Sequence, residues 1–246
     1  MSTRLTPSFK VHFKGTAKSV IVFYIVMLAL FVIDLILNII FVGNNNSEFS
    51  GIEVIASIFF LVFGISCFKP NLKMAFANCV SRKTEFISTM LSAATYSFIM
   101  VFLNAGMVLL FSMTSNSEFA FNQMYSDYVF ANGFIKFLTW FLYEFLSLFS
   151  SFALGYFIGA LYYRMNKGLK IAVSAGVPTI LLIGMPIAIG FFGPNSIFVK
   201  AIVACMDFLI KTVANPYGAI LLALSSVAIF MVLAFLLIRK APIKEQ

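Results

Sequence analysis

Histidine, cysteine and acidic residues are scarce in this chain of 246 residues, and their scarcity excludes most kinds of catalytic site. His12 is the only histidine, so no group of histidines and carboxylates is expected to form a zinc or di-metal centre. Cys67, Cys79 and Cys205 form no C-x-x-C pair, so a disulfide framework is not expected. Neither a G-x-x-x-x-G-K-[ST] nor a G-x-S-x-G sequence occurs. We therefore expect no catalytic residue, cofactor site or metal site in this polypeptide.

Charge is also scarce, and what there is follows a pattern. Charged residues make up 11% of the chain and hydrophobic residues 61%, which is typical of a membrane protein. Long apolar runs alternate with basic clusters. The terminal segments and every second segment between the apolar runs hold all but three of the 17 Lys and Arg residues. The exceptions are Lys136, Lys200 and Lys211, which lie in or beside the other segments. Since basic residues accumulate in cytoplasmic segments, both termini are expected in the cytoplasm. The net charge of +8 then indicates contact with anionic membrane lipid and no nucleic-acid partner.

The apolar runs predict an all-α polytopic fold with six membrane-spanning helices in a single domain covering residues 1–246. About 20 apolar residues are needed to cross the hydrocarbon core of a bilayer. No segment between the runs is long enough to form a soluble domain. The predicted spans are Val20–Val42, Ile52–Phe68, Ile87–Met113, Ile135–Tyr163, Ile171–Phe192 and Tyr217–Ile238.

Two further segments have helical periodicity without the length to span. In residues 5–18, Leu5, Phe9 and Phe13 recur every four residues beside basic side chains, which predicts an amphipathic helix on the inner membrane surface. Residues 193–216 separate an apolar face from a charged one, which predicts an outer helical segment before the sixth span. Membrane anchoring and a mechanical role are both open for these segments.

Acidic side chains within the predicted spans are the first candidates for a functional site. Asp34 in the first span and Glu144 in the fourth both fall in the outer half of the bilayer, where burial costs about 2.5–3.5 kcal/mol on insertion scales. Asn38 lies one helical turn from Asp34, and Asn104 in the third span lies at similar depth. We expect Asp34 and Glu144 to approach one another or a shared cavity. They would form either the lining of a substrate path or a hydrogen-bonded cluster that locks the bundle.

One face of the fourth span continues from Glu144 as a stripe of small residues. Ser147 and Ser151 follow it, and Gly155 and Gly159 form a G-x-x-x-G pair that permits close approach of another helix. This face is expected to contact protein or a water-filled cavity instead of lipid.

The segment between the second and third spans carries a family resemblance. Residues 69–86 have the sequence KPNLKMAFANCVSRKTEF. A short helix followed by a small-x-Ser-Arg-Lys-x-x-Phe stretch before the third span resembles the permease subunits of type-2 ABC exporters. Members of that family commonly have glycine where this chain has Asn78 or Cys79. The likeness extends over the full length in layout: a basic surface helix, six spans, inner termini and an outer helix before the sixth span.

The resemblance implies a dimer of permeases, formed with a second copy or a paralogue, bound to two cytoplasmic ABC ATPases. ATP and Mg would belong to those partner subunits. Residues 69–86 would then form a coupling segment, with a short helix at about Lys73–Ser81 seated on the ATPase. Basic side chains there suit an acidic partner surface, although they also fit a purely topological role. The residues expected to couple are Lys73, Asn78, Ser81, Arg82, Lys83 and Glu85.

The chain is similar in size and Phe-rich character to small bacterial permeases that export phenol-soluble modulins or confer bacteriocin immunity. The implied function is export of amphipathic peptide or lipid-like cargo across a bacterial cell membrane. Two alternatives remain open on the residues: a self-contained six-span channel or secondary carrier, and an accessory membrane protein without a transport path.

Overall fold

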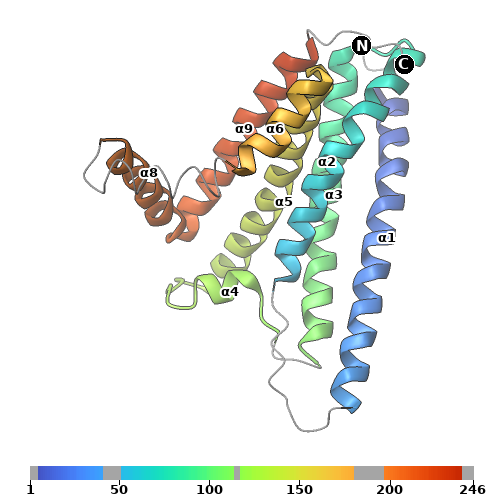
Figure 1. Ribbon diagram of the computed structural model, residues 1–246. Helices are drawn as coiled ribbons and strands as arrows, with labels where there is room; N and C mark the ends of the chain where they lie inside the picture. Colours follow the sequence, from blue (N-terminus) through green and yellow to red (C-terminus); the bar gives the residue numbers. More distant parts are fainter. Residues whose placement is uncertain (1–4, 41–50, 114–116, 180–196, 240–246) are drawn as a thin grey trace.

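The computed structural model describes residues 5–40, 51–113, 117–179 and 197–239, which form a bundle of α-helices (Figure 1). Of these residues 89% are helical and none lies in a β-strand. Five described helices are long and apolar enough to cross a membrane, so the protein is a multi-pass helical membrane protein. They are α1 (Leu5–Ile40), α2 (Ile52–Ala77), α3 (Arg82–Phe111), α5 (Gly133–Arg164) and α9 (Pro216–Arg239). The shorter helices are α4 (Ala120–Met124), α6 (Lys167–Thr179) and α8 (Ile197–Val213).

Five of the six predicted spans correspond to these long helices. The predicted fifth span, Ile171–Phe192, begins within α6, and its residues 180–192 lie outside the described part of the chain. The outer segment predicted at 193–216 contains α8, whose described side chains are largely exposed. The count of six spans therefore remains a prediction.

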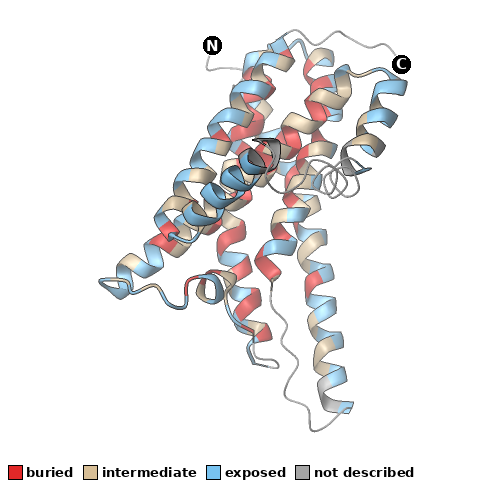
Figure 2. Ribbon diagram, turned by 60° about the vertical axis from the view of Figure 1, so that its left-hand side comes forward, coloured by how far each residue is buried: buried red, intermediate tan, exposed pale blue. Residues whose placement is uncertain are grey.

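Helices α2, α3 and α5 form the centre of the bundle, with α1 packed mainly on α3 and α9 mainly on α5. Burial is concentrated on the central helices (Figure 2). Aromatic and aliphatic side chains fill this core, and the largest that are almost inaccessible include Phe60, Phe68, Met100, Leu148, Phe152 and Tyr156.

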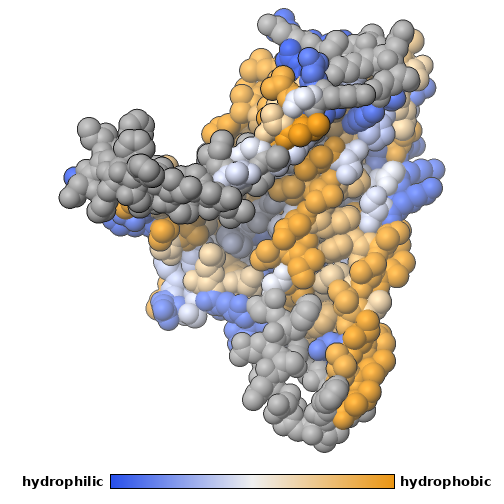
Figure 3. Space-filling model, in the orientation of Figure 1, coloured by the Kyte–Doolittle hydropathy of each residue, from blue (hydrophilic) through white to orange (hydrophobic). Residues whose placement is uncertain are grey.

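The outer helices expose most of their apolar side chains. Ile21, Val22 and Ile25 on α1 and Leu221 and Leu236 on α9 are all exposed, and the space-filling view shows a continuous apolar surface along the lower part of α1 (Figure 3). A soluble protein rarely exposes so large an apolar area. This surface is the part of the bundle that contacts lipid.

Glycines bring α2 and α5 into backbone contact. A Cβ atom on Gly64 would lie 2.6 Å from the carbonyl oxygen of Phe152, and one on Gly155 would collide with the carbonyl oxygen of Leu61. Gly159 also lies against the backbone of α2. The G-x-x-x-G pair of α5 thus faces a third glycine on α2, and close approach of this kind is how small residues stabilise helix pairs in membranes.

The N-terminal segment is not a separate surface helix, so that prediction is wrong. Helix α1 runs without interruption from Leu5 to Ile40, and its 36 residues are about 54 Å long. Contacts with α3 hold its first turns against the bundle: the rings of Phe13 and Tyr96 are 4.7 Å apart, and Tyr96 Oη donates to the Phe13 carbonyl at 2.9 Å. Because the segment has protein partners, it continues the helix axis instead of turning onto the membrane surface.

The predicted short coupling helix at about Lys73–Ser81 is also absent as a separate element. Helix α2 continues through Pro70 to Ala77, a turn follows, and α3 begins at Arg82. Pro70, which has no N–H to donate, lies inside this helix at an exposed position. Within the turn Cys79 has a φ of 51°, the left-handed conformation that favours glycine.

Polar contacts join the helix ends at one end of the bundle. Arg82 Nη1 donates to the last carbonyls of α9, at 3.2 Å to Ile238 and 2.9 Å to Arg239. The Arg82 guanidinium also lies 5.4 Å from the ring of Phe76 at the end of α2. We call this the basic end, because it holds the start of α1, the α2–α3 turn and the ends of α5 and α9, with most of the described Lys and Arg residues.

Candidate functional site

Two buried polar clusters lie between the helices, one towards each end of the bundle. The cluster far from the basic end links three helices. Asn104 on α3 donates from Nδ2 to Glu144 Oε1 on α5 at 2.9 Å, and Tyr24 on α1 donates from Oη to Asn104 Oδ1 at 2.6 Å. Glu144 and Asn104 have exposed fractions of 2% and 1%. The carboxylate therefore has a partner within the protein, as buried charged groups in a membrane require.

Asp34 does not belong to this cluster, contrary to the expected approach of Asp34 and Glu144. It lies ten residues beyond Tyr24, which places it about 15 Å further along α1. Asp34 is half-buried and makes interactions of its own. The side chain of Asn38 lies outside the described residues.

The serines of the predicted stripe remain within their own helix. Ser151 Oγ donates to the Ser147 carbonyl one turn earlier at 2.9 Å, and both residues are half-buried. The serine that joins two helices is Ser150, whose Oγ lies 2.6 Å from Ser226 Oγ on α9. A helix-face argument could not distinguish these neighbouring serines, because the position of α9 is not encoded in the α5 sequence.

A further buried carboxylate, Glu53 at the start of α2, is bonded to the segment that contains α4. The Ala120 N–H at the start of α4 donates to Glu53 Oε2 at 2.6 Å, and Glu53 is buried. Beyond α4, Tyr125 Oη donates to the Val213 carbonyl at the end of α8 at 2.8 Å. Burial, with the nearby Tyr143 as a smaller cause, raises the pKa of Tyr125 to about 12. This phenol therefore stays a hydrogen-bond donor at ordinary pH.

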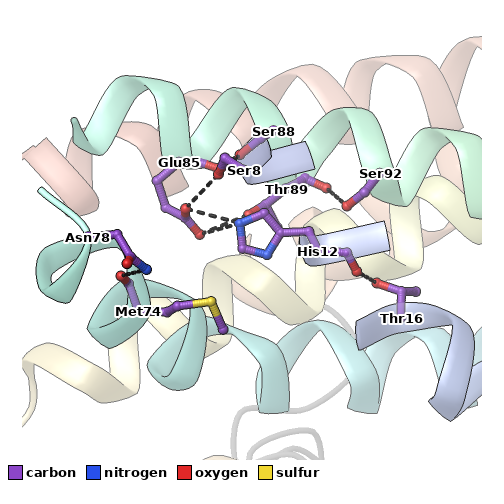
Figure 4. A network of polar contacts seen from close by, with 9 residues as sticks. All are labelled: Ser8, His12, Thr16, Met74, Asn78, Glu85, Ser88, Thr89 and Ser92. Atoms are coloured by element: carbon purple, nitrogen blue, oxygen red, sulfur yellow. Dashed lines mark hydrogen bonds and ion pairs between the residues drawn. The ribbon is translucent and has the colours of Figure 1, made fainter. Parts of the chain in front are cut away.

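The cluster at the basic end is built on His12 and Glu85 (Figure 4). His12 Nε2 on α1 lies 3.0 Å from both carboxylate oxygens of Glu85 on α3, and the side chains have exposed fractions of 4% and 3%. Thr89 Oγ1 donates to Glu85 Oε1 at 3.3 Å, and Ser8 Oγ donates to Oε2 at 3.5 Å. Ser8 Oγ also lies 3.0 Å from Ser88 Oγ. Donors from two helices thus surround one carboxylate.

This placement corrects the role expected for Glu85. As a coupling residue it was expected to face a partner, but it points into the bundle towards α1. The pairing of His12 with Glu85 was not predicted, because the amphipathic interpretation placed His12 on the membrane surface. A signal was present, since Ser8, His12 and Thr16 form a polar stripe at four-residue spacing, and a polar stripe on an otherwise lipid-facing helix indicates a protein contact.

The other expected coupling residues divide into two groups. Arg82 is half-buried and bonded to the end of α9, while Ser81 Oγ caps α3 by accepting from the Thr84 N–H at 3.2 Å. Lys73, Asn78 and Lys83 are exposed. Among these residues, the exposed side chains of Lys73, Asn78 and Lys83 give the α2–α3 turn a basic surface with one amide group. Ser81 and Arg82 hold the turn in position through their hydrogen bonds.

Two adjoining cavities open beside the His12–Glu85 pair. The first, of about 350 Å³, lies between the start of α1 and the α2–α3 turn, and Glu85 is part of its wall. The second, of about 280 Å³, continues along α1 towards the centre of the bundle. Both are lined by Val11, His12 and Met74. Cavities of this size can hold a small ligand or part of a larger one.

The described residues offer no metal centre: within them no group of three or more His, Cys, Asp or Glu side chains is placed to hold an ion. Comparisons with protein-family models, curated proteins and solved structures gave no match.

Proposed function

We propose that the chain is the transmembrane subunit of an ATP-binding-cassette exporter in a bacterial cell membrane. A separate ATPase, present twice, would bind and hydrolyse ATP with Mg. A second permease copy or paralogue would complete the complex. The cargo would be an amphipathic peptide or a lipid-like molecule, which suits an interior rich in Phe and Met.

The observation that carries this proposal is the α2–α3 turn. It combines the sequence likeness of residues 69–86 to a coupling segment with an exposed position at the basic end. Lys73, Asn78 and Lys83 form an exposed surface there that would attract an acidic groove.

The contacts of this turn also suit a mechanical role. Arg82 joins it to the end of α9, and Glu85 joins it to α1 through His12. A displacement of the turn by an ATPase would therefore act on two other helices directly. Bonded, closely packed elements of this kind move as units instead of deforming locally.

A matched pair of charge reversals tests the proposal. The chain is purified in mild detergent, with an ATP-binding-cassette ATPase expected to copurify. Lys73→Glu with Lys83→Glu should reduce ATPase recovery and permease-dependent ATP hydrolysis by about tenfold, equivalent to about 1.4 kcal/mol of lost binding. Lys10→Glu with Arg164→Glu makes the same charge change at the same end on α1 and α5, and should leave both quantities within about twofold of wild type.

Three results would contradict the proposal. They are hydrolysis of ATP by the purified chain alone, absence of any copurifying ATPase, and equal losses in the two double variants. The last would mean that the charges act only on topology or on the membrane surface.

A self-contained secondary carrier is the second candidate, favoured by one observation. Both ends of the bundle hold a buried titratable carboxylate, Glu144 and Glu85, and such groups in membrane helices often form proton or ion relays. Proteoliposomes that hold this chain alone separate the two functions. Cargo uptake driven by a proton gradient without ATPase would support the carrier, and uptake only with ATPase and ATP would support the exporter.

A further inference from the structure

We propose that the two adjoining cavities beside His12 form one binding site for an anionic phospholipid whose head carries hydroxyl groups, of the phosphatidylglycerol class. The site requires only that the protein lies in a membrane, and it does not depend on the proposed exporter function. Three features of the cavities support it: their polar wall, their basic rim and their depth in the bilayer.

The polar wall presents a hydrogen-bond acceptor that is held in a fixed orientation. His12 Nε2 is directed at Glu85, and the other ring nitrogen, Nδ1, points away from that carboxylate (Figure 4). When Nε2 carries the proton and donates it to Glu85, Nδ1 of the neutral ring is an acceptor. A ligand hydroxyl supplies the matching donor.

The remaining polar groups of the wall are uncharged. Ser19, Ser66 and Asn71 line the second cavity and can both donate and accept hydrogen bonds. Among the described residues lining the two cavities there is no Lys or Arg, and the one carboxylate, Glu85, is already engaged by His12. The interior therefore suits neutral hydroxyl groups better than a charged group.

Positive charge lies at the rim instead. Lys14 and Lys18 on α1 are exposed and adjoin the lining residues Gly15 and Ser19, and Lys73 on α2 is exposed beside Met74. A lysine near an anionic membrane surface contributes about 1 kcal/mol of attraction. A phosphodiester at this rim would have its charge compensated while its glycerol group extended towards His12.

The depth of the second cavity matches the headgroup layer. The exposed apolar stretch of α1 begins at Ile21, so the lining residues Ser19 and Gly15 lie about 3 Å and about 9 Å towards the basic end from the start of that surface, one on each side of the outer limit of the headgroup layer. The headgroup layer occupies about 5–8 Å on each side of the hydrocarbon core. Phe63 and Phe152 form the apolar wall of the cavity and would contact the acyl region.

Gly15 offers a way to fill the site without disturbing the helix packing. No atom lies within 4 Å of a Cβ placed on Gly15, so a larger side chain there enters open space. Gly106 on α3 has equally open surroundings and lines neither of the two cavities. Gly15→Leu and Gly106→Leu are therefore a matched pair, since both raise helix propensity and only one occupies the cavity.

The test is lipid retention by the detergent-purified protein, measured by native mass spectrometry. Equal amounts of short-chain phosphatidylglycerol, phosphatidylethanolamine and phosphatidylcholine are added. Wild type and Gly106→Leu should retain phosphatidylglycerol about tenfold more strongly than either other lipid. Gly15→Leu should lose this preference, and His12→Gln, which keeps a donor for Glu85 but has no second ring nitrogen, should reduce it.

Three outcomes would overturn the assignment. Equal retention of the three lipids by wild type would remove the headgroup argument. Unchanged preference in Gly15→Leu would place the lipid elsewhere on the protein. Displacement of the lipid by soluble glycerol phosphate at equal concentration would show that the cavity takes a free metabolite-like headgroup instead of a membrane lipid.

Discussion

At the scale of single residues, the buried pair of His12 and Glu85 determines how α1 is attached to α3 at the basic end. A carboxylate in such a position is stable only while donors surround it. Glu85 receives them from His12, Ser8 and Thr89, so one residue connects two helices through several hydrogen bonds. The same pair orients the imidazole towards the cavities.

Removal of one partner should be far more damaging than removal of both. His12→Leu leaves a buried carboxylate without its principal donor, and we expect a loss of about 3–5 kcal/mol of stability. His12→Leu with Glu85→Met replaces the pair by apolar side chains of similar size, and most of the loss should be recovered. Thermal unfolding of the detergent-purified protein measures both. A double variant no more stable than His12→Leu would show that the pair does more than satisfy its own charges.

The depth of a polar residue along its helix could be predicted from the sequence, but the side chains that it contacts could not. The sequence placed Asn104 and Glu144 at similar depth, because distance along a spanning helix is proportional to residue number. Which side chains meet depends on helix rotation and on which helices are neighbours. For that reason Tyr24 was missed as a partner of Asn104, and Asp34 was wrongly expected near Glu144.

At the scale of elements, the contact between α2 and α5 depends on the absence of side chains. Gly64, Gly155 and Gly159 let the two backbones approach, and a methyl group at Gly155 would meet the Leu61 carbonyl. In a membrane, where lipid competes equally for apolar surface, such close packing supplies much of the attraction between helices.

Gly155→Ala should separate these helices, whereas the same change at Gly106 should not. Overpacking of a well-fitted interface costs about 1–3 kcal/mol, and more where the obstacle is backbone. Gly106→Ala meets no atom within 4 Å and should be neutral or stabilise α3 by up to about 1 kcal/mol. Thermal unfolding of the two variants in the same detergent gives the comparison. Equal stability of both would mean that α2 and α5 do not approach as described.

Helix positions followed from the apolar runs, but helix ends did not. The predicted first span began at Val20 and the second ended at Phe68, whereas α1 begins at Leu5 and α2 ends at Ala77. Hydropathy marks where a helix leaves the hydrocarbon and not where its backbone hydrogen bonds stop. Contacts such as Phe13 with Tyr96 continue α1 beyond that point, and these depend on tertiary packing.

At the scale of the whole molecule, the basic residues that are unevenly distributed in the sequence gather at one end of the bundle. The exposed lysines Lys10, Lys14, Lys73 and Lys83 lie at the basic end, and Lys136 lies in the first turn of α5 at the other end. The exporter proposal depends on the orientation that this asymmetry implies, whereas for the lipid site the orientation decides only the leaflet. An ATPase reaches the α2–α3 turn only from the cytoplasm, and the lipid site then belongs to the inner leaflet.

Single-cysteine labelling of intact cells tests this orientation most directly. Cys67, Cys79 and Cys205 are replaced by alanine, and one cysteine is introduced as Lys83→Cys in the α2–α3 turn or as Ser126→Cys beyond α4, both exposed positions. A membrane-impermeant maleimide should label Ser126→Cys in intact cells and Lys83→Cys only after permeabilisation. Labelling of Lys83→Cys in intact cells, with Ser126→Cys protected, would invert the protein in the membrane and contradict the account.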